Sequence, residues 1–129
     1  MKIEVGLWID HRKAVIVTMG EKGGIIRQVQ SNMEKHVRFS GRSSQVGSAE
    51  DMQDRKFGNH LGRYYEGIIS LIRGADSIWI FGPGEAKVEL ENCLKRDELG
   101  GRIVGVDTVN KMTDLQIAAK VRNHFQRHL

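Results

Sequence analysis

Apolar and polar positions in the first forty residues form short runs of strand length, separated by turn-forming residues. Four such runs, rich in β-branched and aromatic residues, lie at residues 2–10, 13–19, 25–30 and 35–39. The polar triplet Asp10-His11-Arg12 separates the first two runs, and glycines near position 20 separate the second from the third. Because connections this short join neighbouring strands that run in opposite directions, the pattern predicts an antiparallel meander.

The spacing of apolar residues becomes helical after a polar loop. Residues 40–47 have almost no apolar content, which predicts an exposed loop. Apolar residues then recur at helical spacing over residues 49–72, and Gly74 marks the end of a long helix. Tyr64 and Tyr65 are adjacent on this helix, so we expect one of them to face the core and the other to be exposed for contact with RNA or protein.

Two strand–helix units complete the pattern. Residues 77–81 are a continuous apolar run typical of a strand buried on both faces, followed by the turn Gly82-Pro83-Gly84 and a helix at about residues 85–94. A strand at 102–109 precedes a last helix that begins at Thr113, with Gln116 completing a capping box. The apolar face of this last helix comprises Ile117, Ala118, Val121, Phe125 and Leu129.

The order of these elements predicts a single α/β domain over residues 1–129, built on a mixed sheet. An antiparallel meander is followed by two parallel strand–helix units, with three helices in all. The sequence shows neither an internal repeat nor a boundary that would indicate a second domain.

Composition narrows the class of protein. The 129 residues include a single cysteine, Cys93, so the chain can form no internal disulfide and no multi-cysteine metal site, and we expect a buried, inert thiol. No apolar stretch approaches the length of a membrane span, and the N-terminus lacks the apolar core of a signal peptide. We therefore expect a cytoplasmic protein with no membrane partner.

The net charge of +4 is concentrated in two segments. Residues 35–63 carry six basic and three acidic side chains, and residues 111–129 carry four and one, so each segment is +3 and the rest of the chain is −2. Local positive charge favours a polyanionic partner, and we expect RNA rather than DNA. The alternative is that these charges only solvate helix faces.

Three short motifs resemble a family of translation factors. They are Ile80-Phe81-Gly82-Pro83-Gly84-Glu85-Ala86-Lys87 with Leu90, the strand Ile103-Val104-Gly105-Val106-Asp107, and Gly41-Arg42-Ser43-Ser44-Gln45. In sequence and in element order they are similar to the middle domain of archaeal and eukaryotic class I peptide release factors and their bacterial relatives. The resemblance implies a ribonuclease-H-like fold and the ribosome, tRNA or rRNA as partner.

The resemblance also implies a role for the loop at residues 40–47. In the family this loop carries Gly-Arg-Gly-Gly-Gln and enters the peptidyl-transferase centre, where the glutamine helps to place the water that hydrolyses peptidyl-tRNA. Gln45 matches that glutamine as a catalytic residue, whereas Ser43 and Ser44 replace the glycine pair. Serine at a position that needs positive φ costs about 1 kcal/mol or more, which disfavours hydrolysis. We expect a role in ribosome rescue, hibernation or regulation, without a cofactor, and leave enzymatic activity open.

The predicted RNA-binding site is a basic arm at about residues 40–63, together with the end of the strand before it. Cationic side chains bind phosphates, and a polar loop tip suits a narrow RNA cavity. The residues assigned to this site are Arg38, Arg42, Ser43, Ser44, Gln45, Arg55, Lys56 and Arg63. The alternative is an ordinary flexible connection between a strand and a helix.

Other interpretations come from other residues. An anion-binding turn at a helix N-terminus, as against a plain structural turn, would consist of Gly82, Gly84 and Lys87. A Mg²⁺-dependent nuclease, as against a turn role for the first of them, would use the carboxylates of Asp10, Glu66 and Asp107. A protein-interaction or homo-oligomeric module that never contacts RNA is the third hypothesis.

The remaining aromatic and imidazole side chains indicate structure rather than chemistry. Trp8 and Trp79 lie in predicted strands and are expected in the core. His124 and His128 are four residues apart on the last helix with no carboxylate nearby, which favours a solvated helix end and no metal site.

Overall fold

The computed structural model describes residues 2–20, 23–31 and 49–126, with the side chains of the long helix described from residue 61 onward. Its elements in chain order are β1 (Glu4–Ile9), β2 (Lys13–Gly20), β3 (Gly23–Gln30), α2 (Ala49–Ile72), β4 (Ser77–Gly82), α3 (Ala86–Arg96), the 3₁₀ turn η1 (Gly100–Arg102), β5 (Ile103–Thr108) and α4 (Asp114–Gln126). The predicted strands and helices are confirmed in these ranges, with ends that differ by one or two residues. The strand predicted at 35–39 and the loop at 40–47 lie outside them.

The strands form one mixed sheet in the order β3-β2-β1-β4-β5. β1 is the central strand: it pairs antiparallel with β2, where Leu7 lies opposite Ile16, and parallel with β4, where Leu7 lies beside Ile80. β3 extends the antiparallel side, and β5 extends the parallel side. An antiparallel meander followed by two parallel strand–helix units is therefore confirmed, and with it the predicted α/β class.

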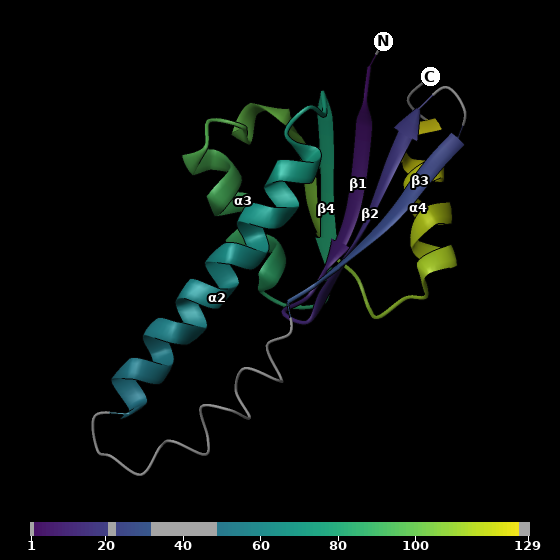
Figure 1. Cartoon of the computed structure of the whole chain (residues 1–129). Helices are drawn as coiled ribbons and strands as arrows, with labels where there is room; N and C mark the ends of the chain where they lie inside the picture. Colours follow the sequence, from purple (N-terminus) through teal and green to yellow (C-terminus); the bar gives the residue numbers. More distant parts are fainter. Residues whose placement is uncertain (1, 21–22, 32–48, 127–129) are drawn as a thin grey trace.

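Helices cover both faces of the sheet and make a three-layer structure. Figure 1 shows α2 and α3 on one side of the sheet and α4 on the other. Alternate residues of β1 divide between the two cores, so that Leu7 packs with the residues of α2 and α3, whereas Trp8 packs with the α4 face. This double burial explains why β1 and β4 are nearly continuous apolar runs, as expected of strands with helices on both faces.

The last helix packs closely against β1 because Gly6 has no side chain. A Cβ at Gly6 would lie 2.4 Å from the Cγ2 atom of Val121 on α4. The capping box is confirmed, since the Thr113 backbone N–H donates to Gln116 Oε1 at 2.9 Å and the Gln116 N–H donates to Thr113 Oγ1 at 3.2 Å. Ile117, Val121 and Phe125 are buried as predicted.

The side chains of the long helix α2 that are described as packing into the core lie in its C-terminal part. Its 24 residues span roughly 36 Å, more than the sheet needs for cover. The buried apolar side chains described on α2 lie between Tyr64 and Ile72, in its C-terminal part. Figure 1 shows the N-terminal half of α2 extending beyond the end of the sheet at which β1 and β4 finish. Within the described ranges, no helix is long and apolar enough to cross a membrane.

Candidate functional site

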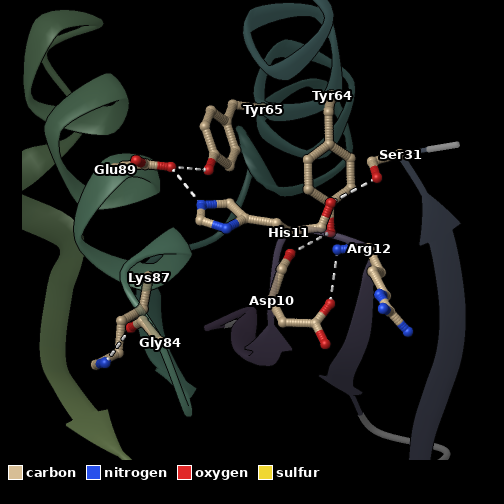
Figure 2. A network of polar contacts seen from close by, with 9 residues as sticks. All are labelled: Asp10, His11, Arg12, Ser31, Tyr64, Tyr65, Gly84, Lys87 and Glu89. Atoms are coloured by element: carbon tan, nitrogen blue, oxygen red, sulfur yellow. Dashed lines mark hydrogen bonds and ion pairs between the residues drawn. The ribbon is translucent and has the colours of Figure 1, made fainter. Parts of the chain in front are cut away.

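The residues predicted to bind RNA are only partly within the described structure. Arg38, Arg42, Ser43, Ser44 and Gln45 lie outside the described residues. The backbone of α2 carries Arg55 and Lys56 in the half of the helix that extends beyond the sheet, and Arg63 is exposed near the start of the packed half. The structure therefore describes the base of the predicted arm, and this base is a network of polar contacts (Figure 2).

The centre of this network is the tight turn between β1 and β2. Asp10 Oδ1 accepts hydrogen bonds from the backbone N–H groups of Arg12 and Lys13, both at 2.8 Å, and the Asp10 N–H donates to the Lys13 carbonyl at 3.0 Å. A carboxylate that bonds the backbone two and three residues later stabilises a turn. The turn interpretation of Asp10 is thus confirmed.

The strand that leads into the arm is tied to the same turn. The Ser31 hydroxyl donates to the His11 carbonyl at 2.6 Å, and the Ser31 backbone N–H donates to the Arg12 carbonyl at 2.9 Å. Ser31 is 3% exposed, so these bonds satisfy polar groups that are shielded from water. The chain therefore leaves β3 from a fixed point on the β1–β2 turn.

The helix that follows the arm is held by two adjacent tyrosines, one bonded to the β1–β2 turn and the other to α3. The prediction that only one of them faces the core is wrong: Tyr64 and Tyr65 are each 4% exposed. Both can be buried because each hydroxyl, at the far end of its ring, has a polar partner. The Tyr64 hydroxyl donates to the Asp10 carbonyl at 3.0 Å, and the Tyr65 hydroxyl donates to Glu89 Oε1 on α3.

Burial sets the protonation of these two phenols. It raises the pKa of Tyr64 above the ordinary tyrosine value, and the nearby Asp10 carboxylate raises it further. For Tyr65 burial again raises the pKa most, followed by the hydrogen bond that its protonated hydroxyl makes to Glu89. Both hydroxyls therefore remain donors throughout the physiological range.

Glu89 on α3 contacts both α2 and the β1–β2 turn. Its Oε1 atom accepts from Tyr65 on α2 and lies 2.8 Å from Nε2 of His11 in the β1–β2 turn. Because an ionised carboxylate only accepts hydrogen bonds, we assign a proton to Nε2 of His11 in this contact. Both partners are accessible, at 45% and 40% of the side-chain surface for His11 and Glu89. We call Asp10, His11, Ser31, Tyr64, Tyr65 and Glu89 the arm-base network.

Sequence reasoning missed the pairing of His11 with Glu89. The two residues are 78 positions apart, and neither belongs to a motif. The usable signal was topological: β1 and β4 are parallel, so the turn after β1 and the helix after β4 begin at the same edge of the sheet.

The glycine turn that follows β4 is closely packed at its first residue. A Cβ at Gly82 would lie 2.1 Å from the Ile9 carbonyl oxygen, whereas a Cβ at Gly84 would meet nothing within 4 Å. Lys87 is 8% exposed, and its ammonium donates to the Gly84 carbonyl. This bond closes the turn at the start of α3. Anion binding by Gly82, Gly84 and Lys87 stays a prediction.

The carboxylates of the nuclease hypothesis are engaged separately. Asp10 bonds its own turn, and Asp107 Oδ2 accepts from the indole N–H of Trp79 at 2.6 Å. Glu66 is exposed on α2. Across the described ranges, no group of three acidic, histidine or cysteine side chains is arranged to hold a metal ion. The structure therefore gives no support to a carboxylate cluster for Mg²⁺.

The aromatic side chains of the α4 face form a second cluster. Trp8 and Trp79 are buried as predicted, at 1% and 5% exposure. The ring of His124 stacks on Trp79 with centroids 4.0 Å apart and an interplanar angle of 10°. The prediction of a solvated helix end is thus wrong for His124, which is half-buried, while His128 lies outside the described residues.

Cys93 on α3 is half-buried rather than fully buried. Burial raises the pKa of its thiol, an effect larger than the lowering by Arg96, whose guanidinium lies 3.4 Å from the sulfur. A raised pKa leaves little thiolate at neutral pH, in agreement with the predicted inert thiol.

Comparison with known proteins identifies the fold. No protein-family model and no curated protein sequence matches this chain. Among solved structures, the Pelota protein of Thermoplasma acidophilum matches 96% of the chain with a TM-score of 0.58 and 17% identity. The chain has a release-factor-like fold.

Two further structures support this assignment. Pelota of Archaeoglobus fulgidus matches 99% of the chain with a TM-score of 0.51 and 15% identity, and the archaeal translation termination factor aRF1 matches 98% with a TM-score of 0.53 and 11% identity. The chain spans 31%, 37% and 39% of the T. acidophilum Pelota, A. fulgidus Pelota and aRF1 chains, respectively. The release-factor-like fold thus corresponds to about a third of each of these proteins, and the resemblance drawn from the three motifs is confirmed for the fold.

Proposed function

We propose that this protein binds the ribosome or tRNA through the basic arm at residues 40–63 and acts in ribosome rescue, hibernation or regulation. The observation that carries the proposal is the extension of α2 beyond the sheet, because the backbone positions of Arg55 and Lys56 lie in that extending half of the helix. The release-factor-like fold, shared with Pelota and with a translation termination factor, supports the same proposal.

The chemistry of the arm suits RNA. Arg42, Arg55, Lys56 and Arg63 supply cations for phosphate contacts, which give binding that weakens as salt is added. A narrow helical arm reaches recessed RNA surfaces that a flat face cannot contact, and single-stranded loops offer bases and 2′-hydroxyls to a polar tip. The tip in this proposal is the segment that contains Ser43, Ser44 and Gln45.

Binding without hydrolysis is the form of the proposal that the sequence favours. Ser43 and Ser44 stand where the release-factor loop has glycines, and a Cβ restricts both the backbone conformation and its approach to RNA. Peptidyl-tRNA hydrolysis through Gln45 is the alternative form. The replacement Gln45→Ala separates the two, since it abolishes hydrolysis but leaves salt-sensitive ribosome binding nearly unchanged.

Sedimentation with purified ribosomes over a range of salt concentrations tests the proposal. The combined replacement of Arg42, Arg55 and Lys56 by alanine removes three cations from the arm. We expect weaker binding, and a slope of log K against log salt that is smaller by about 2 to 3. The matched control replaces Arg73, Lys95 and Arg96 by alanine; these residues carry the same charge, but Arg73 follows the end of α2 and the other two lie on α3.

The control variant should keep its fold and its affinity. Arg73 and Lys95 take part in exposed ion pairs with Asp97 and Glu91, and such pairs contribute about 0 to 1 kcal/mol each. Equal loss in the two triple variants would reduce the effect to net charge and contradict a specific arm. A stable oligomer with no RNA affinity would instead support the interaction-module hypothesis.

A further inference from the structure

The last described residue after β3 and the packed half of α2 are both bonded to one turn of three residues. β3 ends at the turn through Ser31, which bonds the carbonyls of His11 and Arg12. α2 returns to it through Tyr64, which bonds the carbonyl of Asp10. The turn therefore bonds the chain on either side of the arm, and the direction of α2 depends on how firmly its base is held there.

One side chain braces this base against the rest of the domain. Glu89 lies on α3, which is packed on the same sheet face as α2, and its Oε1 atom is shared by Tyr65 of α2 and His11 of the turn. Tyr65 is 4% exposed, so in the intact protein Glu89 rather than water is the acceptor for its hydroxyl. A shared acceptor couples the two donors, because neither contact can change without affecting the other.

We propose that Glu89 is a positioning residue that sets the orientation of α2, and hence of the arm, relative to the sheet. Residue 53 of α2 lies roughly 17 Å along the helix axis from Tyr64, so a rotation of about 15° at the base moves it by roughly 4 Å. The relevance of this movement to ribosome binding rests on the proposed function. The orientation itself is a property of the free protein.

Distance measurement between two spin labels tests the inference without any ribosome. The labels are placed by Gln53→Cys on α2 and by Asn123→Cys on the exposed side of α4, in a background with Cys93→Ala. Double electron–electron resonance spectroscopy then gives the distribution of distances between the two labels. We expect Glu89→Ala to broaden this distribution at least 1.5-fold or shift its mean by several ångströms.

A matched control comes from the same helix. Glu91→Ala removes the same type of side chain from α3, and Glu91, which is half-buried, pairs with the exposed Lys95 rather than with the arm-base network. It should leave the distribution unchanged. Tyr65→Phe should broaden the distribution by itself and add nothing when combined with Glu89→Ala, because Glu89→Ala has already removed the contact of Tyr65. If Glu89→Ala does not fold, Glu89→Gln, which keeps an acceptor but loses the charge, should give an intermediate distribution.

Two outcomes would overturn the inference: identical distributions for Glu89→Ala and wild type, or equal broadening by Glu91→Ala. Ribosome binding then separates this inference from the proposed function. Glu89→Ala should weaken binding several-fold with an unchanged salt slope, because no phosphate contact is lost. If the orientation changes while wild-type protein shows no affinity for ribosomes, the positioning role stands and the proposed function fails.

Discussion

Replacement of Gly82 by alanine should destabilise the fold by distorting the backbone of β1. The added Cβ would lie 2.1 Å from the Ile9 carbonyl oxygen, and 3.2 Å from the Ile9 carbonyl carbon. Both atoms belong to the main chain, so no side chain can rotate to make room. The strand ends must separate by about 1 Å to restore an ordinary contact between non-bonded atoms.

This separation affects neighbours on both sides. The Gly82 carbonyl accepts a hydrogen bond from the Val109 N–H at 3.0 Å, just beyond β5. The Asp10 carbonyl, directly after Ile9, accepts a hydrogen bond from the Tyr64 hydroxyl in the arm-base network. Overpacking costs about 1 to 3 kcal/mol, and a weakened hydrogen bond adds about 1 kcal/mol. The lower entropy of the unfolded alanine chain offsets up to about 1 kcal/mol. We therefore expect the free energy of unfolding to fall by about 2 to 3 kcal/mol.

Urea denaturation followed by circular dichroism measures this change. With a urea dependence of about 2 kcal/mol per M, the midpoint should fall by about 1 M. Gly84→Ala is the control two residues later, because its Cβ would meet nothing within 4 Å, and its midpoint should stay close to that of wild type. Equal midpoints for Gly82→Ala and wild type would refute the close approach of β4 to Ile9.

Three further predictions concern packing and protonation. Gly6→Ala should destabilise the protein, and Val121→Ala should relieve part of that cost in the double variant, because this clash is with a side chain; denaturation of all three variants would show the non-additivity. Tyr64 and Tyr65 are the only tyrosines, and their pKa values are raised in the folded state, so absorbance at 295 nm should show no phenolate at pH 10 until the protein unfolds. Because only the unfolded chain releases these protons there, the free energy of unfolding should fall as the pH rises above about 10. Burial raises the pKa of Cys93, so iodoacetamide at pH 8 should alkylate it several-fold more slowly in native protein than in urea.

Local patterns predicted the elements because the forces that form them are local. Strand runs, the capping box of Thr113 and the apolar face of α4 each depend on residues within a few positions of one another. The mixed character of the sheet, antiparallel in its first part and parallel in its second, followed from connection length and crossover handedness. These rules need no knowledge of individual contacts, which is why the α/β class was predictable.

The arm-base network was not predictable in the same way. Helical periodicity places Tyr64 and Tyr65 about 100° apart and treats one as exposed, but each ring ends in a hydroxyl that finds a partner on another element. His11 and Glu89 meet only after β1 and β4 have paired. Contacts of this kind depend on the assembled sheet, and no local pattern encodes them.

The central place of β1 also fixes the order in which the sheet can be completed during synthesis. Its antiparallel partner β2 follows within a few residues, as Ile9 pairs with Ala14, but its parallel partner β4 pairs Glu4 with Ser77. At ribosomal rates of roughly 5 to 20 residues per second, β4 emerges about 4 to 15 s after β1. During that interval one edge of β1 lacks its partner strand, and the face of β1 that packs against α4 lacks its cover. The nascent β1–β2 hairpin is therefore the species that chaperones or self-association would act on, most of all before α2 (Ala49–Ile72) has emerged.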